Sequence, residues 1–259
     1  MQLVDSHCHL DLLDLTPYSN NIENVLTTAA TQDVNYFLCV CVTLKDFPMM
    51  LNKILDYPNV WGSVGLHPNE KTSYEPTVED LFLLGSTKKI IAIGETGLDY
   101  YRTEDNHDFQ HERFRVHIRA AKKLNKPLII HSRQAKADTL RILREERADV
   151  VHGVMHCFTE DLDMAEAAID MGFYISFSGI VTFSNAKDLQ NVARAIPFER
   201  MLIETDCPWL APVPHRGKPN YPGYVRHVAE FIAELRGVSL EEVAEITTRN
   251  FFTLFHPEN

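Results

Sequence analysis

The most constraining feature of this sequence is a His-x-His motif that directly follows a short apolar segment near the N-terminus. Leu3 and Val4 lead into residues 5–9, DSHCH, a pattern typical of a short buried strand. Because side chains alternate between the two faces of a strand, His7 and His9 should point the same way. Two neighbouring imidazoles can bind one metal ion, so the fold should bring further ligands to this point.

The rest of the chain repeats one pattern, in which a helical segment is followed by a short apolar run. Runs of this length suit strands that are covered on both faces of a parallel sheet. We expect strands at residues 3–9, 36–42, 60–67, 90–95, 127–131, 150–156, 173–178 and 201–206. We expect helices at residues 20–33, 46–56, 77–87, 105–125, 134–147, 161–171, 184–196, 221–236 and 239–255.

This alternation predicts an α/β fold, specifically a (β/α)₈ TIM barrel. The chain has 259 residues, close to the roughly 250 of a typical barrel of this kind. A doubly wound open sheet is the alternative, but the glycine-rich turn expected after its first strand is missing. No linker or internal repeat divides the sequence, so we expect one domain over residues 1–259.

Composition narrows the class of protein. The chain is 45% apolar and carries a net charge of −11, the wrong sign for holding nucleic acid by broad electrostatic attraction. It lacks an apolar segment of the roughly 20 residues that a membrane span needs, so we expect a cytoplasmic protein without a membrane partner. Its five cysteines lack CxxC spacing and are expected to be reduced thiols.

Potential metal ligands lie at the ends of five of the eight predicted strands. In a parallel barrel these ends meet at one rim, so side chains far apart in the sequence converge there. A single histidine after an apolar run is more often structural, whereas coincidence across five strands is much rarer. The expected ligands are His7, His9, Glu95, His131, His156 and Asp206.

These six ligands exceed what one tetrahedral zinc ion requires, so we expect two divalent metal ions per subunit. We assign His7, His9 and Asp206 to one ion and His131 and His156 to the other, and Glu95 is expected to bridge them. Mixed nitrogen and oxygen ligands suit Zn, Mn, Co or Ni, with Mg as a further candidate. The expected catalytic residues are Asp206, which could deprotonate a bound water or serve only as a ligand, and the bridging Glu95.

Other rim residues are candidates for holding a substrate. The arginines at 102, 133 and 216 follow predicted strands, where each could clamp a phosphate or remain a solvated surface residue. His67 could contact phosphate or cap the loop before Pro68. Glu204 is expected behind the ligands, as a partner for a ligand histidine.

Several neighbouring residues have more ordinary interpretations. Asp99 is expected in a loop beyond the fourth strand, where the sequence favours neither a structural nor a functional role over the other. Packing is favoured over base stacking for Tyr100, Tyr101 and Trp209. Strand alternation should turn the cysteines that adjoin the ligands, Cys8, Cys157 and Cys207, away from the metal.

The motifs together resemble the TatD family of metal-dependent deoxyribonucleases, which belongs to the amidohydrolase-like barrels. They are, in order, DSHCHLD (5–11), VGLHPN (64–69), GETGLDYYR (94–102), IIHSR (129–133), HCF (156–158) and ETDCPWLAP (204–212). The resemblance implies that the six ligands named above bind divalent metal. It also implies hydrolysis of DNA phosphodiester bonds, with 3′ to 5′ exonuclease activity on single-stranded or frayed 3′ ends.

Two other functions fit the same residues. Activated hydroxide attacks carbonyl carbon as well as phosphorus, so a metal-dependent amide or ester hydrolase is the first alternative. A non-catalytic metal-dependent binding protein is the second. Arginines at the rim favour a phosphate substrate over an amide or ester, and the complete set of ligands favours an enzyme over a binding protein.

Overall fold

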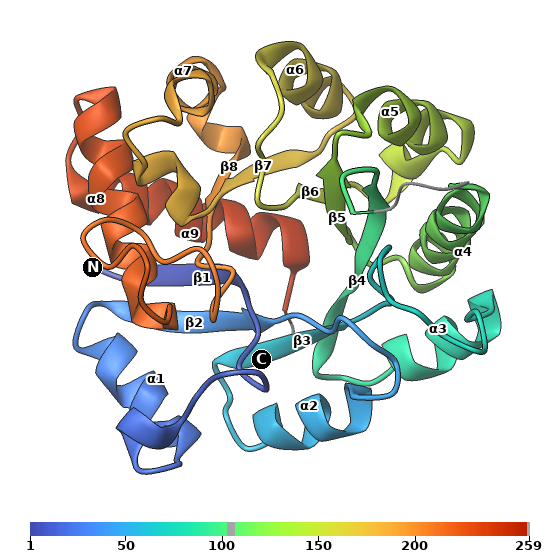
Figure 1. Ribbon diagram of the computed structural model, residues 1–259, viewed down its shortest axis with the longest axis horizontal. Helices are drawn as coiled ribbons and strands as arrows, with labels where there is room; N and C mark the ends of the chain where they lie inside the picture. The colour runs from blue at the N-terminus through green and yellow to red at the C-terminus, as the bar shows by residue number, and fades with distance from the viewer. Residues whose placement is uncertain (103–106, 258–259) are drawn as a thin grey trace.

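The computed structural model describes residues 1–102 and 107–257. Strands and helices alternate along the chain, and the strands lie at the centre of the molecule with the helices around them (Figure 1). The strands are β1 (Leu3–Cys8), β2 (Val34–Cys39), β3 (Val60–Val64), β4 (Ile90–Asp99), β5 (Leu128–Arg133), β6 (Gly153–Met155), β7 (Tyr174–Phe177) and β8 (Met201–Ile203).

The eight strands form one parallel sheet in sequential order from β1 to β8. Two main-chain hydrogen bonds join its first strand to the segment after its last. The amide of Asp206 donates to the carbonyl of His7 at 2.9 Å, and the amide of His9 donates to the carbonyl of Cys207 at 2.9 Å. The sheet is therefore a nearly closed barrel, and the predicted (β/α)₈ fold is confirmed.

The helices lie outside the sheet, and each predicted helix has an observed counterpart. They are α1 (Ile22–Ala30), α2 (Phe47–Ile54), α3 (Val78–Gly85), α4 (Asp108–Leu124), α5 (Lys136–Glu145), α6 (Leu162–Asp170), α7 (Lys187–Ala195), α8 (Val225–Arg236) and α9 (Leu240–Phe255). The predicted beginning of α4, at residues 105 and 106, lies outside the described residues. Local signals fix the helix ends, as where Thr77 and Asp80 form a capping box at the start of α3.

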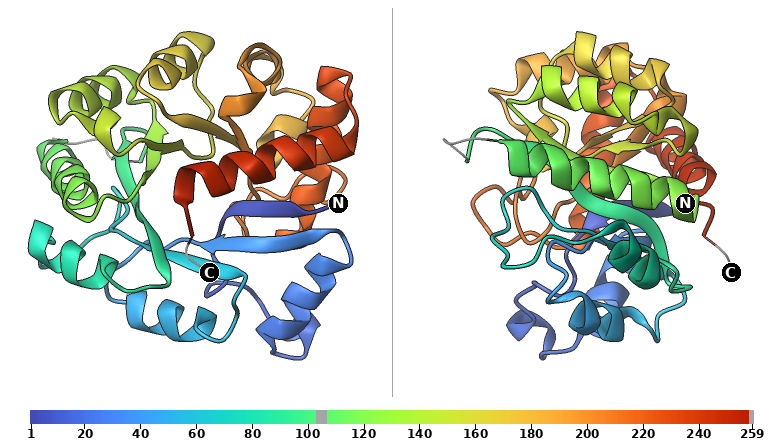
Figure 2. Two further views of the ribbon diagram at one scale, coloured as in Figure 1. Left: turned by 180° about the vertical axis from the view of Figure 1, so that it is seen from behind. Right: turned by 90° about the vertical axis from the view of Figure 1, so that its right-hand side faces the viewer.

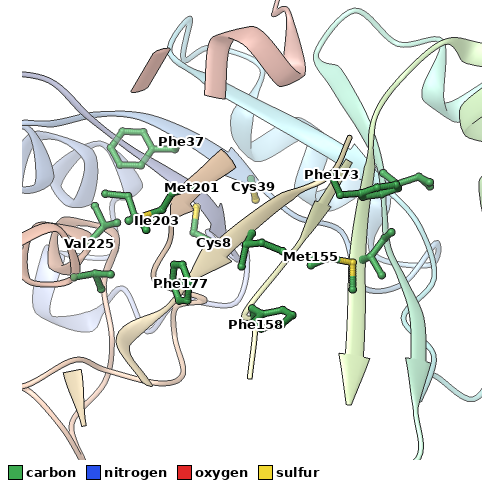
Figure 3. Packing of buried hydrophobic residues seen from close by; sticks show 14 of the residues in the cluster. Cys8, Phe37, Cys39, Met155, Phe158, Phe173, Phe177, Met201, Ile203 and Val225 are labelled. Carbon is green, nitrogen blue, oxygen red and sulfur yellow. The ribbon is translucent and has the colours of Figure 1, made fainter. Parts of the chain in front are cut away.

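Two buried apolar clusters surround the sheet on its two faces. The larger one packs the outside of the strands against the helices, and Phe37, Phe173 and Phe177 are among its members (Figure 3). The smaller one takes side chains from every strand, for example Val4 and Leu202, and adds Phe251 of α9. Helix α9 lies across one end of the barrel (Figure 2). Asn250 of α9 donates to the carbonyl of Met201, the first residue of β8, so we infer that α9 closes the end at which the strands begin.

Each strand ends a few residues before or after its predicted end, and three of these differences change where residues named above are placed. Strand β4 runs on to Asp99, beyond the predicted end at Glu95, because it stays paired with β5 as far as Arg133. Strands β6 and β8 stop at Met155 and Ile203, so His156 and Asp206 lie on the segments that follow them. Among the described residues, none of the helices is both long enough and apolar enough to cross a membrane.

Candidate active site

A cleft of about 660 Å³ opens at the carboxyl ends of the strands. Most of the predicted ligands line it, and His7 lies just beneath its surface with 1% exposure. Its lining consists of His9, Val42, His67, Glu70, Glu95, Asp99, Arg102, His131, Ser132, Arg133, His156, Cys157, Thr159, Ile180, Asp206, Trp209 and Leu210.

Glu95 lies at the centre of the ligands, and its two carboxylate oxygens face different histidines. Oε1 lies 2.8 Å from Nε2 of His156 and 3.1 Å from Nδ1 of His131. Oε2 lies 3.5 Å from Nε2 of His7. One carboxylate thus has an oxygen available to each of two neighbouring ligand groups.

The first group, here called the β1–β8 group, consists of His7, His9 and Asp206. The Nε2 atoms of the two histidines are 3.2 Å apart, so both imidazoles do point the same way. Oδ1 of Asp206 lies 3.2 Å from Nε2 of His9. On the other side of the His9 ring, Nδ1 donates to the carbonyl of Val40 at 2.9 Å, which leaves the lone pair of Nε2 for a metal ion.

The second group, here called the β3–β5 group, consists of His67, Asp99 and His131. His131 uses both ring nitrogens, because its Nε2 lies 3.1 Å from Oδ2 of Asp99 while its Nδ1 faces Glu95. Nε2 of His67 lies 3.5 Å from Oε1 of Glu95. Nδ1 of His67 accepts a hydrogen bond from the amide of Asn69 at 3.1 Å, which fixes the orientation of the ring.

His156 lies between the two groups and is supported from behind by Glu204. Its Nε2 faces Glu95, and its Nδ1 lies 3.2 Å from Oε1 of Glu204. The same Glu204 oxygen accepts from the amide of Cys157 at 2.8 Å. A fully buried carboxylate against the rear nitrogen of an imidazole is the usual arrangement behind a metal-ligating histidine.

Gly94 allows Glu95 to reach the centre of the cleft. Its φ of +151° lies in a region that L side chains rarely adopt, and a Cβ at this position would lie 2.6 Å from the carbonyl oxygen of Ile129. Strands β4 and β5 can approach this closely only because residue 94 lacks a side chain. The first glycine of the GETGLD motif is therefore required by the backbone.

The electrostatics of the cleft keep Glu95 ionised and act differently on different histidines. Burial raises the pKa of Glu95, but the imidazoles of His156 and His67 outweigh burial and hold that pKa well below its usual value. Burial lowers the pKa of His67 to about 4 and also lowers the pKa of His7. At His9, His131 and His156 burial also lowers the pKa, but the neighbouring carboxylates outweigh it and raise the pKa of all three. A divalent metal ion would displace protons from these rings, and carboxylates with imidazoles are a donor set suited to such an ion.

Three sets of side chains in the described residues bring ligand atoms within 4.8 Å of one another. They are His7 with His9 and Glu95, His7 with His156 and Asp206, and His67 with Glu95 and His131. The buried Nδ1 of His7 and Oε2 of Glu204 have no hydrogen-bond partner among the described residues. These residues fit bound metal, since so dense a set of buried polar groups is costly without a partner.

Comparison with known proteins decides the family. The profile of the family described as "TatD related DNase" matches residues 4–256 of the chain. The chain belongs to the TatD family. The resemblance in its motifs is thereby confirmed, and the chain is a metal-dependent hydrolase of this family.

TatD proteins similar to this chain are matched over almost their whole length. The uncharacterized metal-dependent hydrolase YcfH of Escherichia coli K12 is 51% identical over 99% of this chain and 96% of its own. The 3′-5′ ssDNA/RNA exonuclease TatD of Escherichia fergusonii is 29% identical over 94% and 96%. The crystal structure of the TatD homologue YjjV from E. coli K12 superposes with a TM-score of 0.90 at 27% identity, covering 98% of each chain.

The candidate substrate-binding residues of this chain are not all in the cleft. Arg102 and Arg133 line it, and the Arg133 guanidinium lies 3.8 Å from the centre of the Tyr101 ring. Arg216 is not part of the lining; its guanidinium instead lies 4.1 Å from the centre of the Phe183 ring. The loop after β8 directs residue 216 away, which strand order alone could not reveal.

Asp99 and Cys157 were placed wrongly by sequence reasoning. Asp99 is the last residue of β4 instead of a loop residue, and it touches His131. Cys157 lines the cleft because β6 ends at Met155, so strand alternation no longer applies to it. Cys8 does lie within β1 and packs in the core as expected (Figure 3). The sequence did contain a signal for Asp99, because Asp99 ends the GETGLD motif and lies four residues after Glu95, the central ligand.

Proposed function

We propose that this chain is a deoxyribonuclease that removes nucleotides from 3′ ends of single-stranded or frayed DNA, using two divalent metal ions and a water molecule. The observation that carries the proposal is the position of Arg102 and Arg133 in the same cleft as the ligands around Glu95. Guanidinium groups bind phosphate oxygens through paired hydrogen bonds. A hydrolase for neutral amides or esters would have no need of two cations beside its ligands.

The two oxygens of Glu95 support a shared ligand. Each faces a separate histidine, as a bridge between ions about 3.5 to 4 Å apart requires. The ligands as we assigned them are His7, His9 and Asp206 for one ion and His131 and His156 for the other, and the geometry makes His67 a further candidate beside His131. Bound metal would lower the pKa of a water ligand and neutralise charge on the phosphate.

The protein's own side chains have distinct parts in the reaction. Asp206 has 15% of its side chain exposed, and its carboxylate can accept the proton of the attacking water. Its pKa is lowered because the hydrogen bond with His9 and the charges of neighbouring imidazoles outweigh the effect of burial. Arg102 and Arg133 would position the phosphate.

Two exposed aromatic rings offer surfaces for nucleobases. Trp209 lines the cleft beside His9, with the ring centres 5.2 Å apart, and half of its side chain is exposed. Tyr101 is 56% exposed on the arginine side of the cleft. Base stacking on such rings is tolerant of sequence, which suits an exonuclease. The exposure of both rings therefore favours base stacking, although their sequence context favoured packing.

A direct test compares labelled oligonucleotides with other substrates. Single-stranded and blunt duplex DNA, each labelled at the 5′ end, would be incubated with the protein and Mg²⁺, Mn²⁺ or Zn²⁺. We expect a ladder that shortens one nucleotide at a time from the 3′ end, faster on single strands, and no turnover after EDTA treatment. Circular dichroism should show the barrel still folded after chelation, because its core is independent of the site.

Other outcomes would identify the alternatives. Turnover of an amide or ester panel with DNA left intact would replace the nuclease by an amidohydrolase. Intact DNA and intact panels under every metal would indicate a binding protein. A 3′-phosphorothioate terminus serves as the matched control, since it should slow a 3′ exonuclease while leaving attack from the 5′ end unaffected.

A further inference from the structure

A second pair of facing imidazoles lies away from the candidate active site, where the loop of residues 209–220 meets α8. His215 lies in this loop and His227 lies on α8, and their Nε2 atoms are 3.2 Å apart. Both side chains are partly exposed, so an ion could enter from solvent. We propose that His215 and His227 form a separate transition-metal site, binding an ion of the Zn²⁺, Ni²⁺ or Cu²⁺ class that favours imidazole.

The distance between the two nitrogens suits shared coordination. Two imidazoles on one tetrahedral zinc ion, each about 2.0 to 2.1 Å from the metal, have their nitrogens about 3.3 Å apart. In the β1–β8 group the Nε2 atoms of His7 and His9 show the same 3.2 Å separation. His215 and His227 thus repeat the geometry of the two histidines that we assign to metal in the cleft.

The side chains around the pair orient both rings for binding. Nδ1 of His227 lies 3.1 Å from Oε2 of Glu230, so a proton held there leaves the Nε2 lone pair free for a metal ion. The other Glu230 oxygen accepts from Nε of Arg226 at 2.8 Å. His215 stacks on Tyr224 with ring centres 3.9 Å apart and planes 4° from parallel.

His215 is also held in its neutral form. Burial lowers its pKa, and the neighbouring His227 and Lys218 lower it further, so its Nε2 is available at neutral pH. In the described part of the chain no third histidine, cysteine or carboxylate completes a compact three-residue group with this pair. Water would fill the remaining positions, and the site should bind metal more weakly than the cleft does.

An ion at this place would fasten the 209–220 loop to α8. The loop begins at Trp209, on the edge of the cleft, and its other end is already held by Asn220, which donates to the carbonyls of Thr205 and Trp209. Metal bound by His215 would restrain the middle of the loop. We therefore expect the site to affect loop mobility.

The test counts bound ions in the full-length protein. Wild type, His215→Asn, His227→Asn and a control, His256→Asn, would be dialysed against fixed free Zn²⁺ and their zinc content measured by elemental analysis. His256 is an exposed histidine whose left-handed φ of 40° suits asparagine. We expect wild type and the control to retain one more ion per chain than the other two variants. Equal zinc content in all four proteins would overturn the proposal.

A further variant keeps both imidazoles and tests the proposal even if the first two variants fail to fold. Glu230→Gln removes the carboxylate behind His227, so the Zn²⁺ affinity of the His215–His227 site should fall about 10-fold to 100-fold. Hydrogen exchange of residues 209–220 gives an independent measurement. Zn²⁺ should slow exchange there further in wild type than in Glu230→Gln at a concentration near the dissociation constant. If Zn²⁺ slowed the exchange of residues 209–220 in neither protein, the pair would be only a hydrogen bond.

Discussion

The two ligand groups around Glu95 are held in different ways. The β1–β8 group is fixed by main-chain contacts. The amide of Asp206 donates to the carbonyl of His7, and the carbonyl of Val40 accepts from the ring of His9. The first of these bonds is part of the closure of the barrel, and the second joins the segments that follow β1 and β2. The geometry of this group therefore follows from the fold itself.

The β3–β5 group depends on individual side chains. Asp99 holds His131 and in turn accepts from the side chain of Asn69 at 2.8 Å. Helix α4 supports the same region, because Arg113 donates to the carbonyl of His67 at 2.7 Å and His117 accepts from the amide of Leu66 at 3.0 Å. Single substitutions should therefore disturb the β3–β5 group while the barrel stays folded, whereas the β1–β8 group should be harder to change separately.

The largest effect should come from Glu95, the residue between the two groups. Glu95→Gln keeps the shape of the side chain but removes its charge, so both metal positions should lose affinity. We expect fewer than two bound ions per chain and a kcat on an oligonucleotide at least about 10²-fold lower, as for other losses of charge stabilisation at a reaction centre. Elemental analysis and single-turnover kinetics would measure the two effects.

His131→Ala is the matched comparison for that experiment. It removes one ligand from the β3–β5 group and leaves Glu95 in contact with His7 and His156, so metal should be lost chiefly from one position. Near wild-type turnover of Glu95→Gln with two ions bound would show that Glu95 is not a bridge. Full wild-type activity with one ion bound would end the two-metal mechanism.

Protonation of His117 should weaken the support of the β3–β5 group in acid. Burial lowers its pKa to about 4, below the value near 6.5 of the unfolded chain. Between these pH values the unfolded chain binds more protons, so stability rises with pH across the window. His117 therefore stabilises the fold fully above about pH 6.5, and on the order of 3 kcal/mol is lost as pH falls towards 4.

Urea denaturation of metal-free protein at a series of pH values would measure this loss. His117→Gln is neutral at every pH, so its stability should change less between pH 6.5 and pH 4, even if the variant is less stable at pH 7. Hydrogen exchange at the amide of Leu66 gives a local measurement, since that amide donates to His117. If stability depended on pH equally in wild type and His117→Gln, protonation of His117 would not be the cause of the loss.

The difference between the two groups also explains how much the sequence could predict. Apolar runs and helical segments were sufficient for the barrel, and the ligands that end strands converge because parallel strands end together. The contact between Asp99 and His131 depends on how far β4 extends, and the departure of Arg216 depends on the path of a loop. Strand periodicity specifies neither. Main-chain topology was thus predictable, and side-chain networks at loop ends were not.

Asp99→Asn tests whether the β3–β5 group depends on its carboxylate. The variant leaves the shape unchanged but weakens the support of His131, so metal affinity at one position should fall about 10-fold to 100-fold. Asp163→Asn, on the exposed surface of α6, is the control and should leave affinity unchanged. Calorimetric titration with Mn²⁺ would measure both. Loss of both ions from Asp99→Asn would mean that the two groups are not separable.

The smallest effect should come from the arginines, which we propose to contact the substrate and not the metal. Arg133→Ala removes a cation from the cleft and the partner of the exposed Tyr101 ring. If it contacts phosphate equally in the ground and transition states, KM for DNA should rise several-fold with kcat little changed, and the salt dependence of KM should flatten. Arg102→Ala should have the same effect. Arg216→Ala should have the weakest effect, because the guanidinium of Arg216 lies over Phe183.

Kinetics at three salt concentrations would distinguish loss of a phosphate contact from loss of packing, because loss of packing alone would shift KM equally at every salt concentration. A fall in kcat without a change in KM would instead place Arg133 at the reacting phosphate, and the β3–β5 side of the cleft would then contribute to chemistry as well as to binding.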